Sequence, residues 1–191
     1  MKRRGNTRRP DTSAIRRAWT IVCVLFVCAV ALLARGVVIY RLYPLEYKDE
    51  IAQYSSEYEM DPYMVCAMIK AESSFRTGAV SGDGAVGLMQ VLPSTGEWVA
   101  GKLGIENFSE DMLTDPAVNI RIGCWYLHYL DGLFGGNTDH MIAAYNAGQN
   151  NVLKWIAEDE NLENIPFQET ENYLNKVNAY YEIYKGLYKF S

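Results

Sequence analysis

Metal ligands are scarce in this chain of 191 residues, which has only two histidines and four cysteines. Structural zinc sites draw their ligands from these residue types, usually as closely spaced pairs. The sequence has no close cysteine pair and no histidine cluster, so it predicts no metal site, and it implies no organic cofactor. Cys66 and Cys124 lie in predicted helices, where they would form either a disulfide in an oxidising compartment or two buried free thiols.

Basic side chains are scarce after residue 41. From Leu42 onward the chain has 9 basic and 22 acidic residues, a net charge of −13. A nucleic-acid partner needs a basic face that neutralises its phosphates, so this composition argues against one. The basic residues gather instead in residues 1–17, where seven of them accompany a single acid, and the overall charge of −5 hides this asymmetry.

Charge of either sign is absent from residues 18–34, and the apolar run continues past Arg35 to Tyr40. At about 1.5 Å per residue the uncharged run is slightly short for a bilayer, so Arg35 would have to extend its side chain to the interface. The basic residues before it predict a cytoplasmic tail over 1–17, a membrane anchor over 18–40 and an extracytoplasmic remainder. The small residues Ala29-Val30-Ala31 leave a cleaved signal peptide open as the alternative.

Long stretches that alternate apolar and polar residues are also missing, which excludes a sheet of any size. Glycines over 80–91 allow at most a short hairpin. After a linker over 41–47, helical patterns recur throughout a predicted all-α domain that spans 48–191. Asp61, Asp115 and Thr138 are the expected N-caps, and Gly148 is an expected C-terminal stop. The predicted helices cover 48–59, 62–74, 94–103, 116–134, 139–147, 151–158 and 170–188.

Glu72 shares one helix face with the apolar residues Val65, Met68 and Ile69. Burial among them and the negative end of the helix dipole both disfavour the charged carboxylate, which predicts a raised pKa. A carboxylic acid that keeps its proton near neutral pH, followed by a glycine-rich loop, is suited to general acid catalysis. Periodicity alone leaves the alternative of an exposed glutamate at a helix end beside a flexible loop.

Three sequence blocks then occur in order. They are Glu72-Ser73-Ser74-Phe75 with Ser81 and the G-A-V-G-L-M-Q run over 84–90 and Pro93, the A-A-Y-N-A-G run over 143–148, and the E-T-E-N-Y run over 169–173. Together they resemble the signature of the family 1 lytic transglycosylases, the soluble-lytic-transglycosylase-type enzymes of the lysozyme-like superfamily, over roughly residues 45–188. The resemblance implies an all-α, goose-type-lysozyme-like fold with at most a minor hairpin, acting on the MurNAc-β-1,4-GlcNAc bond of peptidoglycan strands.

The resemblance further implies a mechanism with a single acid. Glu72 would protonate the glycosidic oxygen, the substrate's N-acetyl group would stabilise the charge at C1, and Glu72 would then help the 6-hydroxyl attack. Most glycosidases need a second carboxylate, for which Asp83 is the local candidate, although it is interpreted as a loop residue. Two alternatives remain, a hydrolytic muramidase on the same fold and a glycan-binding scaffold module without turnover.

The same blocks imply a set of substrate-binding residues: Ser81, Met89, Gln90, Tyr145, Asn146, Glu169 and Tyr173. Each also has a structural interpretation, namely a turn for the serine, a cap for the glutamine, core packing for the methionine and tyrosines, backbone hydrogen bonding for the asparagine, and helix-terminal electrostatics for the glutamate. The sequence assigns no sugar contact to Trp98, Trp125 or Trp155.

Overall fold

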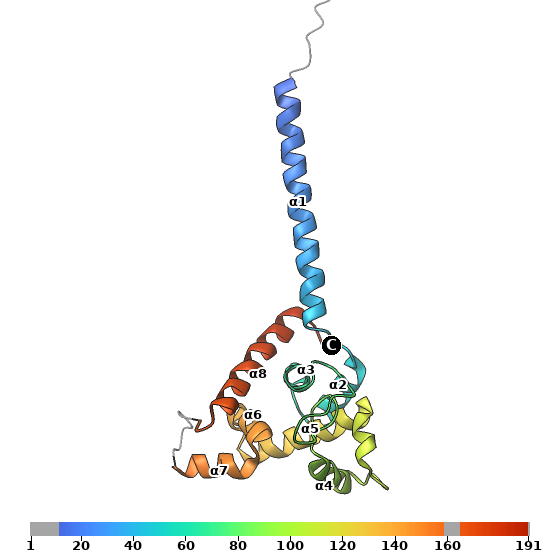
Figure 1. Ribbon diagram of the computed structural model, residues 1–191, viewed down its shortest axis with the longest axis vertical. Helices are drawn as coiled ribbons and strands as arrows, with labels where there is room; N and C mark the ends of the chain where they lie inside the picture. Colours follow the sequence, from blue (N-terminus) through green and yellow to red (C-terminus); the bar gives the residue numbers. More distant parts are fainter. Residues whose placement is uncertain (1–11, 159–164, 191) are drawn as a thin grey trace, which may run out of the picture. The chain divides into compact units, whose positions relative to one another are not determined.

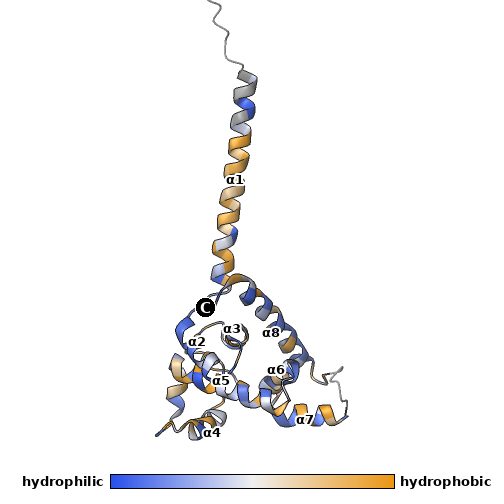
Figure 2. Cartoon of the chain, turned by 180° about the vertical axis from the view of Figure 1, so that it is seen from behind, coloured by the Kyte–Doolittle hydropathy of each residue, from blue (hydrophilic) through white to orange (hydrophobic). Residues whose placement is uncertain are grey.

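The computed structural model describes residues 12–158 and 165–190, which divide into two compact units at Pro44–Leu45. The first unit consists of helix α1 (Thr12–Leu42). Within it Trp19–Leu42 is long and apolar enough to cross a membrane, with a mean hydropathy of 2.7 and no buried residue in its most apolar stretch. Figure 2 shows this apolar stretch along the helix. The helix begins at Thr12, so its first turns belong to the segment predicted as the basic tail.

The second unit is all-α, as predicted. Its α-helices are α2 (Lys48–Glu57), α3 (Pro62–Glu72), α4 (Pro93–Leu103), α5 (Pro116–Leu133), α6 (Thr138–Ala147), α7 (Gln149–Glu158) and α8 (Gln168–Leu187), and a 3-10 helix η1 (Glu110–Thr114) precedes α5. In place of the possible hairpin, residues 80–91 make two isolated bridges, Val80 with Val86 and Val86 with Val91. The 3-10 helix was not predicted.

Helix starts follow local capping chemistry. The Asp61 carboxylate accepts a hydrogen bond from the backbone amide of Tyr63, and the Asp115 carboxylate accepts one from Val118, so both predicted caps are confirmed. The predicted cap Thr138 is wrong. The preceding Asn137 accepts from the amide of His140 and starts α6 one residue earlier, because an asparagine side chain serves an N-cap better than a threonine.

Helix α3 is the centre of the domain. Residues Met64–Ile69 are buried without interruption, which is possible because this turn of the helix is apolar on every side. The most extensive helix contact joins α3 to α8, and α2 also packs on α3. Figure 1 shows α3 nearly end-on, surrounded by the other helices. Glu72, the last residue of α3, therefore lies at the edge of the apolar core that Met64–Ile69 help to form.

Cys66 on α3 and Cys124 on α5 are both buried and free, so the disulfide alternative is not realised. Burial raises the pKa of the Cys66 thiol to about 12, and burial likewise raises the pKa of Cys124. Thiols held in the protonated form are poor nucleophiles and weak metal ligands. These two side chains therefore serve as small apolar core residues.

Candidate active site

Glu72 is the last residue of α3, and its side chain is half-buried. Burial raises the pKa of its carboxyl to about 7, against an ordinary value of 4.5. The Tyr173 hydroxyl, which donates a hydrogen bond to Glu72 Oε1, and the positive charge of Lys176 both oppose this rise. The effect of desolvation is the larger one, so the rise in pKa that was predicted from the helix face is confirmed. The group can both hold and release a proton near neutral pH.

Two tyrosines surround the carboxyl. Tyr173 on α8 is buried, and besides its bond to Glu72 its hydroxyl lies 3.6 Å from the sulfur of Met68. Tyr145 on α6 donates from its hydroxyl to the carbonyl of Met89 at 2.8 Å. Burial, followed by the nearby charge of Glu72, raises the pKa of both phenols well above 10. The two hydroxyls therefore stay protonated, and they donate to the Glu72 carboxyl and to the Met89 carbonyl respectively.

The chain leaves α3 through two residues in the left-handed region, Ser74 at φ 52° and Phe75 at φ 65°. A bulky residue with positive φ is costly unless packing holds it there. Phe75 is 5% exposed and its ring lies 6.1 Å from that of Tyr184 on α8. The packed phenylalanine thus fixes the sharp turn that ends the helix directly after Glu72.

The glycine-rich loop is closed by its own polar side chains. Ser81 Oγ accepts a hydrogen bond from the backbone amide of Ala85 at 3.0 Å. The Gln90 amide donates to the carbonyls of Ala79 and Gly87, at 3.0 and 2.9 Å. Both residues therefore shape the loop, in keeping with their structural interpretation, and Gln90 also faces a groove described below.

Asn119 on α5 holds the same loop from beneath. Its fully buried side chain accepts from the amide of Met89 at 2.8 Å and donates to the carbonyls of Val86 and Leu113, at 3.0 and 2.8 Å. Gly87 lies against this amide at φ 83°, where a Cβ would collide with Asn119 and with the Leu113 carbonyl. Asn119 was not predicted as a site residue, because a polar residue on a predicted helix carries no local sign of burial.

Met89 is fully buried, and a Cβ on Gly123 of α5 would meet its sulfur. Its side chain therefore packs in the core, and only its carbonyl, which accepts from Tyr145, faces the site residues. Glu169 and Asp83 are both exposed, the first in the first turn of α8 and the second in the glycine-rich loop. Neither is among the groups that shift the pKa of Glu72.

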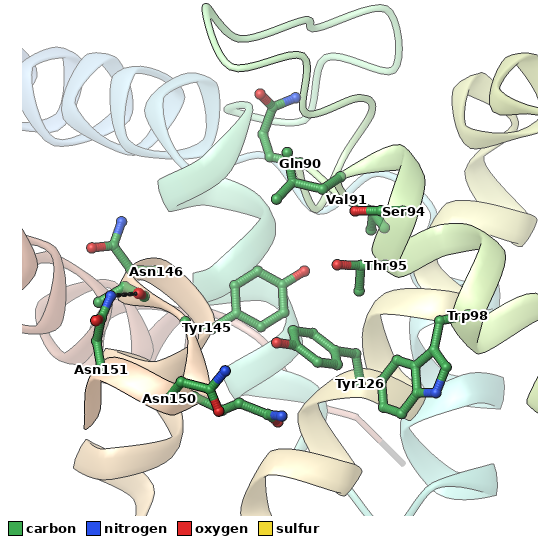
Figure 3. Close-up of a pocket in the computed structure, with 14 residues that line it drawn as sticks. Gln90, Val91, Ser94, Thr95, Trp98, Tyr126, Tyr145, Asn146, Asn150 and Asn151 are labelled. Atoms are coloured by element: carbon green, nitrogen blue, oxygen red, sulfur yellow. Dashed lines mark hydrogen bonds between the residues drawn. The ribbon is translucent and has the colours of Figure 1, made fainter. Parts of the chain in front are cut away.

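A groove of about 680 Å³ runs between the loop, α4, α5 and the α6–α7 corner. Of the predicted residues, Gln90, Tyr145 and Asn146 line it, as Figure 3 shows. Asn146 accepts a hydrogen bond from Thr170 at 2.9 Å, which ties the groove to the start of α8. The groove is also lined by residues that were not predicted as site residues: Val91, Leu92, Ser94, Thr95, Trp98, Tyr126 and the polar start of α7.

No group of three or more His, Cys, Asp or Glu side chains within 12–158 and 165–190 is arranged to hold a metal ion. What the described residues bring together is one carboxyl with a raised pKa, two protonated phenols, and a groove that one of these phenols, Tyr145, lines. Glu72 and Tyr173 are not among the residues that line this groove. Together with the all-α fold, these features are those of a lysozyme-like domain.

The family comparison agrees with this class of protein. The transglycosylase SLT domain family matches residues 49–168, well over half of the chain, and the chain belongs to that family. It is 35% identical over 155 residues to a soluble lytic murein transglycosylase of Escherichia coli strain K12, a match that covers 75% of this chain and 24% of that protein. A putative soluble lytic murein transglycosylase of Haemophilus influenzae is 38% identical over 121 residues, which is 60% of this chain and 20% of the relative.

Solved structures show the same fold. The 70 kDa soluble lytic transglycosylase of Escherichia coli superposes with a TM-score of 0.73 at 34% identity, over 78% of this chain and 25% of that one. An inactive glutamate-to-glutamine mutant of the lytic transglycosylase Slt of Pseudomonas aeruginosa gives 0.70 at 33% identity, over 76% and 25%. This chain spans about a quarter of the length of these relatives.

Proposed function

We propose that this chain is a lytic transglycosylase that cleaves the MurNAc-β-1,4-GlcNAc bond of peptidoglycan. The observation that carries the proposal is the Glu72 carboxyl, whose pKa burial raises to about 7 and whose Oε1 accepts a hydrogen bond from Tyr173. A group with this pKa works as an acid and as a base at neutral pH. The domain family and the named activity of the relatives support the reaction class.

The reaction has two steps. In the first, protonated Glu72 gives its proton to the glycosidic oxygen, the bond from C1 of MurNAc to that oxygen breaks, and the N-acetyl oxygen of the substrate bonds to C1. In the second, the Glu72 carboxylate takes the proton of the 6-hydroxyl while O6 attacks C1 and displaces the N-acetyl oxygen. A 1,6-anhydro ring closes, Glu72 regains its proton, and no water is consumed.

A mechanism with one acid fits the surroundings of Glu72. Burial, Tyr173 and Lys176 set its pKa, and no second carboxylate contributes within the described ranges. Glycosidases with two carboxylates place them about 5 to 10 Å apart, close enough to affect one another. In the lytic transglycosylase Slt of Pseudomonas aeruginosa a glutamate-to-glutamine mutant is inactive, so that relative needs a glutamate for its activity.

The predicted binding residues take different roles in this proposal. Gln90, Tyr145 and Asn146 line the groove and contact the glycan. Tyr173 is a positioning residue, because it acts on the substrate through Glu72. Ser81 keeps the glycine-rich loop in place, and the Met89 carbonyl keeps Tyr145 in place. Exposed Glu169 lies at the start of α8 next to Thr170, whose hydroxyl donates a hydrogen bond to Asn146.

The test is a product analysis. The full chain, purified in a non-ionic detergent, is incubated with purified peptidoglycan, and the released muropeptides are treated with borohydride and analysed by mass spectrometry. Transglycosylation predicts ends that resist reduction and are lighter than hydrolysed ends by one water molecule. Glu72→Gln should lower turnover by several orders of magnitude, whereas the exposed Glu106→Gln should leave it unchanged. Reducible ends would instead indicate a muramidase, and no release from a folded protein that still sediments with peptidoglycan would indicate a binding module.

We also propose that α1 anchors the chain in the cytoplasmic membrane of a bacterium, with the catalytic domain outside. The apolar segment Trp19–Leu42 and the basic residues before it support this orientation. A reporter fused after Ser191 should then be active only outside the cytoplasm, and the chain should stay with membranes in high salt. A soluble mature form that starts near Leu32 would show signal-peptide cleavage instead.

A further inference from the structure

Trp98 stands out among the groove residues because it is a large aromatic side chain that stays 39% exposed. It projects from α4 against three rings of α5, in edge-to-face contacts with Trp125 at 5.3 Å, Tyr126 at 6.2 Å and Tyr129 at 5.0 Å between ring centroids. Such contacts hold the indole in one orientation. Trp98 therefore loses little side-chain entropy when a ligand packs against it. Trp98 is therefore a rigid, partly open platform.

This platform is connected to the proposed catalytic centre through aromatic rings. Tyr126 lies between Trp98 and Tyr145, and its ring centroid is 5.5 Å from that of Tyr145. Tyr145 in turn is close enough to Glu72 for the carboxylate charge to raise its pKa. Trp98 is thus one ring farther from the acid than Tyr126, along a continuous wall of the groove (Figure 3).

The groove is also lined by a run of side-chain amides at the start of α7, formed by Gln149, Asn150 and Asn151. The Asn151 amide donates to the Ala147 carbonyl at 2.7 Å, so it is fixed at the helix start. Gln149 Oε1 is buried and has no hydrogen-bond partner among the described residues. An unpaired buried acceptor is costly unless a ligand or water donates to it.

The groove has no charged side chain among its described lining residues. A carboxylate-bearing peptide or a phosphate would find no cation here, whereas a neutral ring with hydroxyl and amide groups would find both an aromatic face and amide partners. Pyranose rings carry apolar C–H faces that pack on aromatic rings, and their hydroxyl and N-acetyl groups both donate and accept hydrogen bonds. The lining chemistry favours an N-acetylated sugar.

We propose that Trp98 and the Gln149–Asn151 amides form an additional sugar subsite that holds an N-acetylhexosamine ring of the glycan strand beyond the rings at the cleaved bond. The glycan itself rests on the proposed function, but the subsite does not require the transglycosylation chemistry. It would make the affinity of the enzyme depend on strand length, because only a strand that extends past Tyr126 reaches Trp98.

Binding of a defined probe tests the subsite. The full chain in detergent, carrying Glu72→Gln to prevent cleavage, is titrated with a β-1,4-linked hexamer of N-acetylglucosamine in a calorimeter. Trp98→Ala should weaken hexamer binding about tenfold, and Trp98→Phe should keep most of the affinity. Phe167→Ala is the matched control, since it removes a 54% exposed aromatic ring that does not line the groove.

A second variant covers the case in which Trp98→Ala fails to fold, which thermal unfolding would reveal. Asn150 is exposed and also lines the groove, and Asn150→Ala should weaken hexamer binding about threefold through loss of a hydrogen bond. Unchanged affinity in folded Trp98→Ala and in Asn150→Ala would overturn the subsite, as would a parent protein that does not bind the hexamer.

Product analysis of the wild-type chain separates this inference from the proposed function. Reducible ends, or no turnover, together with weakened hexamer binding in Trp98→Ala would overturn transglycosylation and leave the subsite supported. Anhydro ends together with unchanged binding in Trp98→Ala would overturn the subsite alone.

Discussion

The raised pKa of Glu72 makes a quantitative prediction about stability. In the unfolded chain this carboxyl loses its proton near its ordinary value of 4.5, whereas in the folded domain it does so near about 7. Between these values the folded state binds more protons than the unfolded state, so stability falls as the pH rises through this window. Glu72→Gln removes the titrating group and should remove this loss.

The difference between the two values sets the size of the effect. At about 1.36 kcal/mol per pKa unit, the ionised Glu72 should destabilise the fold by about 3 kcal/mol above pH 7. Glutamine is neutral at every pH, and its carbonyl oxygen can still accept the Tyr173 hydroxyl. The variant should therefore match the wild type at pH 4.5 and be about 3 kcal/mol more stable at pH 8, which for a domain of this size is roughly 10 °C in Tm.

The assay is thermal unfolding of the full chain in a non-ionic detergent, followed by circular dichroism at several pH values between 4.5 and 8. All other titrating groups are common to both proteins, so the difference curve isolates Glu72. Glu106→Gln, which changes an exposed glutamate in the same way, should give a flat difference curve. A Glu72→Gln difference that is also independent of pH would refute the argument that burial raises the pKa.

Three further predictions concern the surroundings of the acid. Tyr173→Phe removes the hydrogen bond that lowers the pKa of Glu72, so that pKa should rise and the pH dependence of kcat should move upward with little change in KM. Asn119→Ala breaks three buried hydrogen bonds to the loop and should cost about 2 to 4 kcal/mol of unfolding free energy by chemical denaturation, whereas retained stability would show that the loop closes without it. Cys66 and Cys124 should resist alkylation in the native domain and react after unfolding, and rapid native labelling would contradict their burial.

Features with a local physical cause could be read from the sequence. Asp61 and Asp115 cap the helices that they were predicted to start, because capping depends only on the next few residues. The apolar segment of α1 could be predicted from composition alone. The burial of Glu72 followed from its helix face, because Val65 and Ile69 fix which side of α3 meets the core.

Tertiary structure alone decided which groups meet the acid and the loop. Tyr173 reaches Glu72 from 101 residues away, and Asn119 reaches Met89 from 30 residues away, so no periodicity or cap could indicate either contact. The same applies to Trp98, which became part of the groove wall because the packing of α4 on α5 places it there. Local sequence determines a helix and its buried face through short-range sterics and hydrogen bonds, whereas a site built from several helices depends on how those faces pack together.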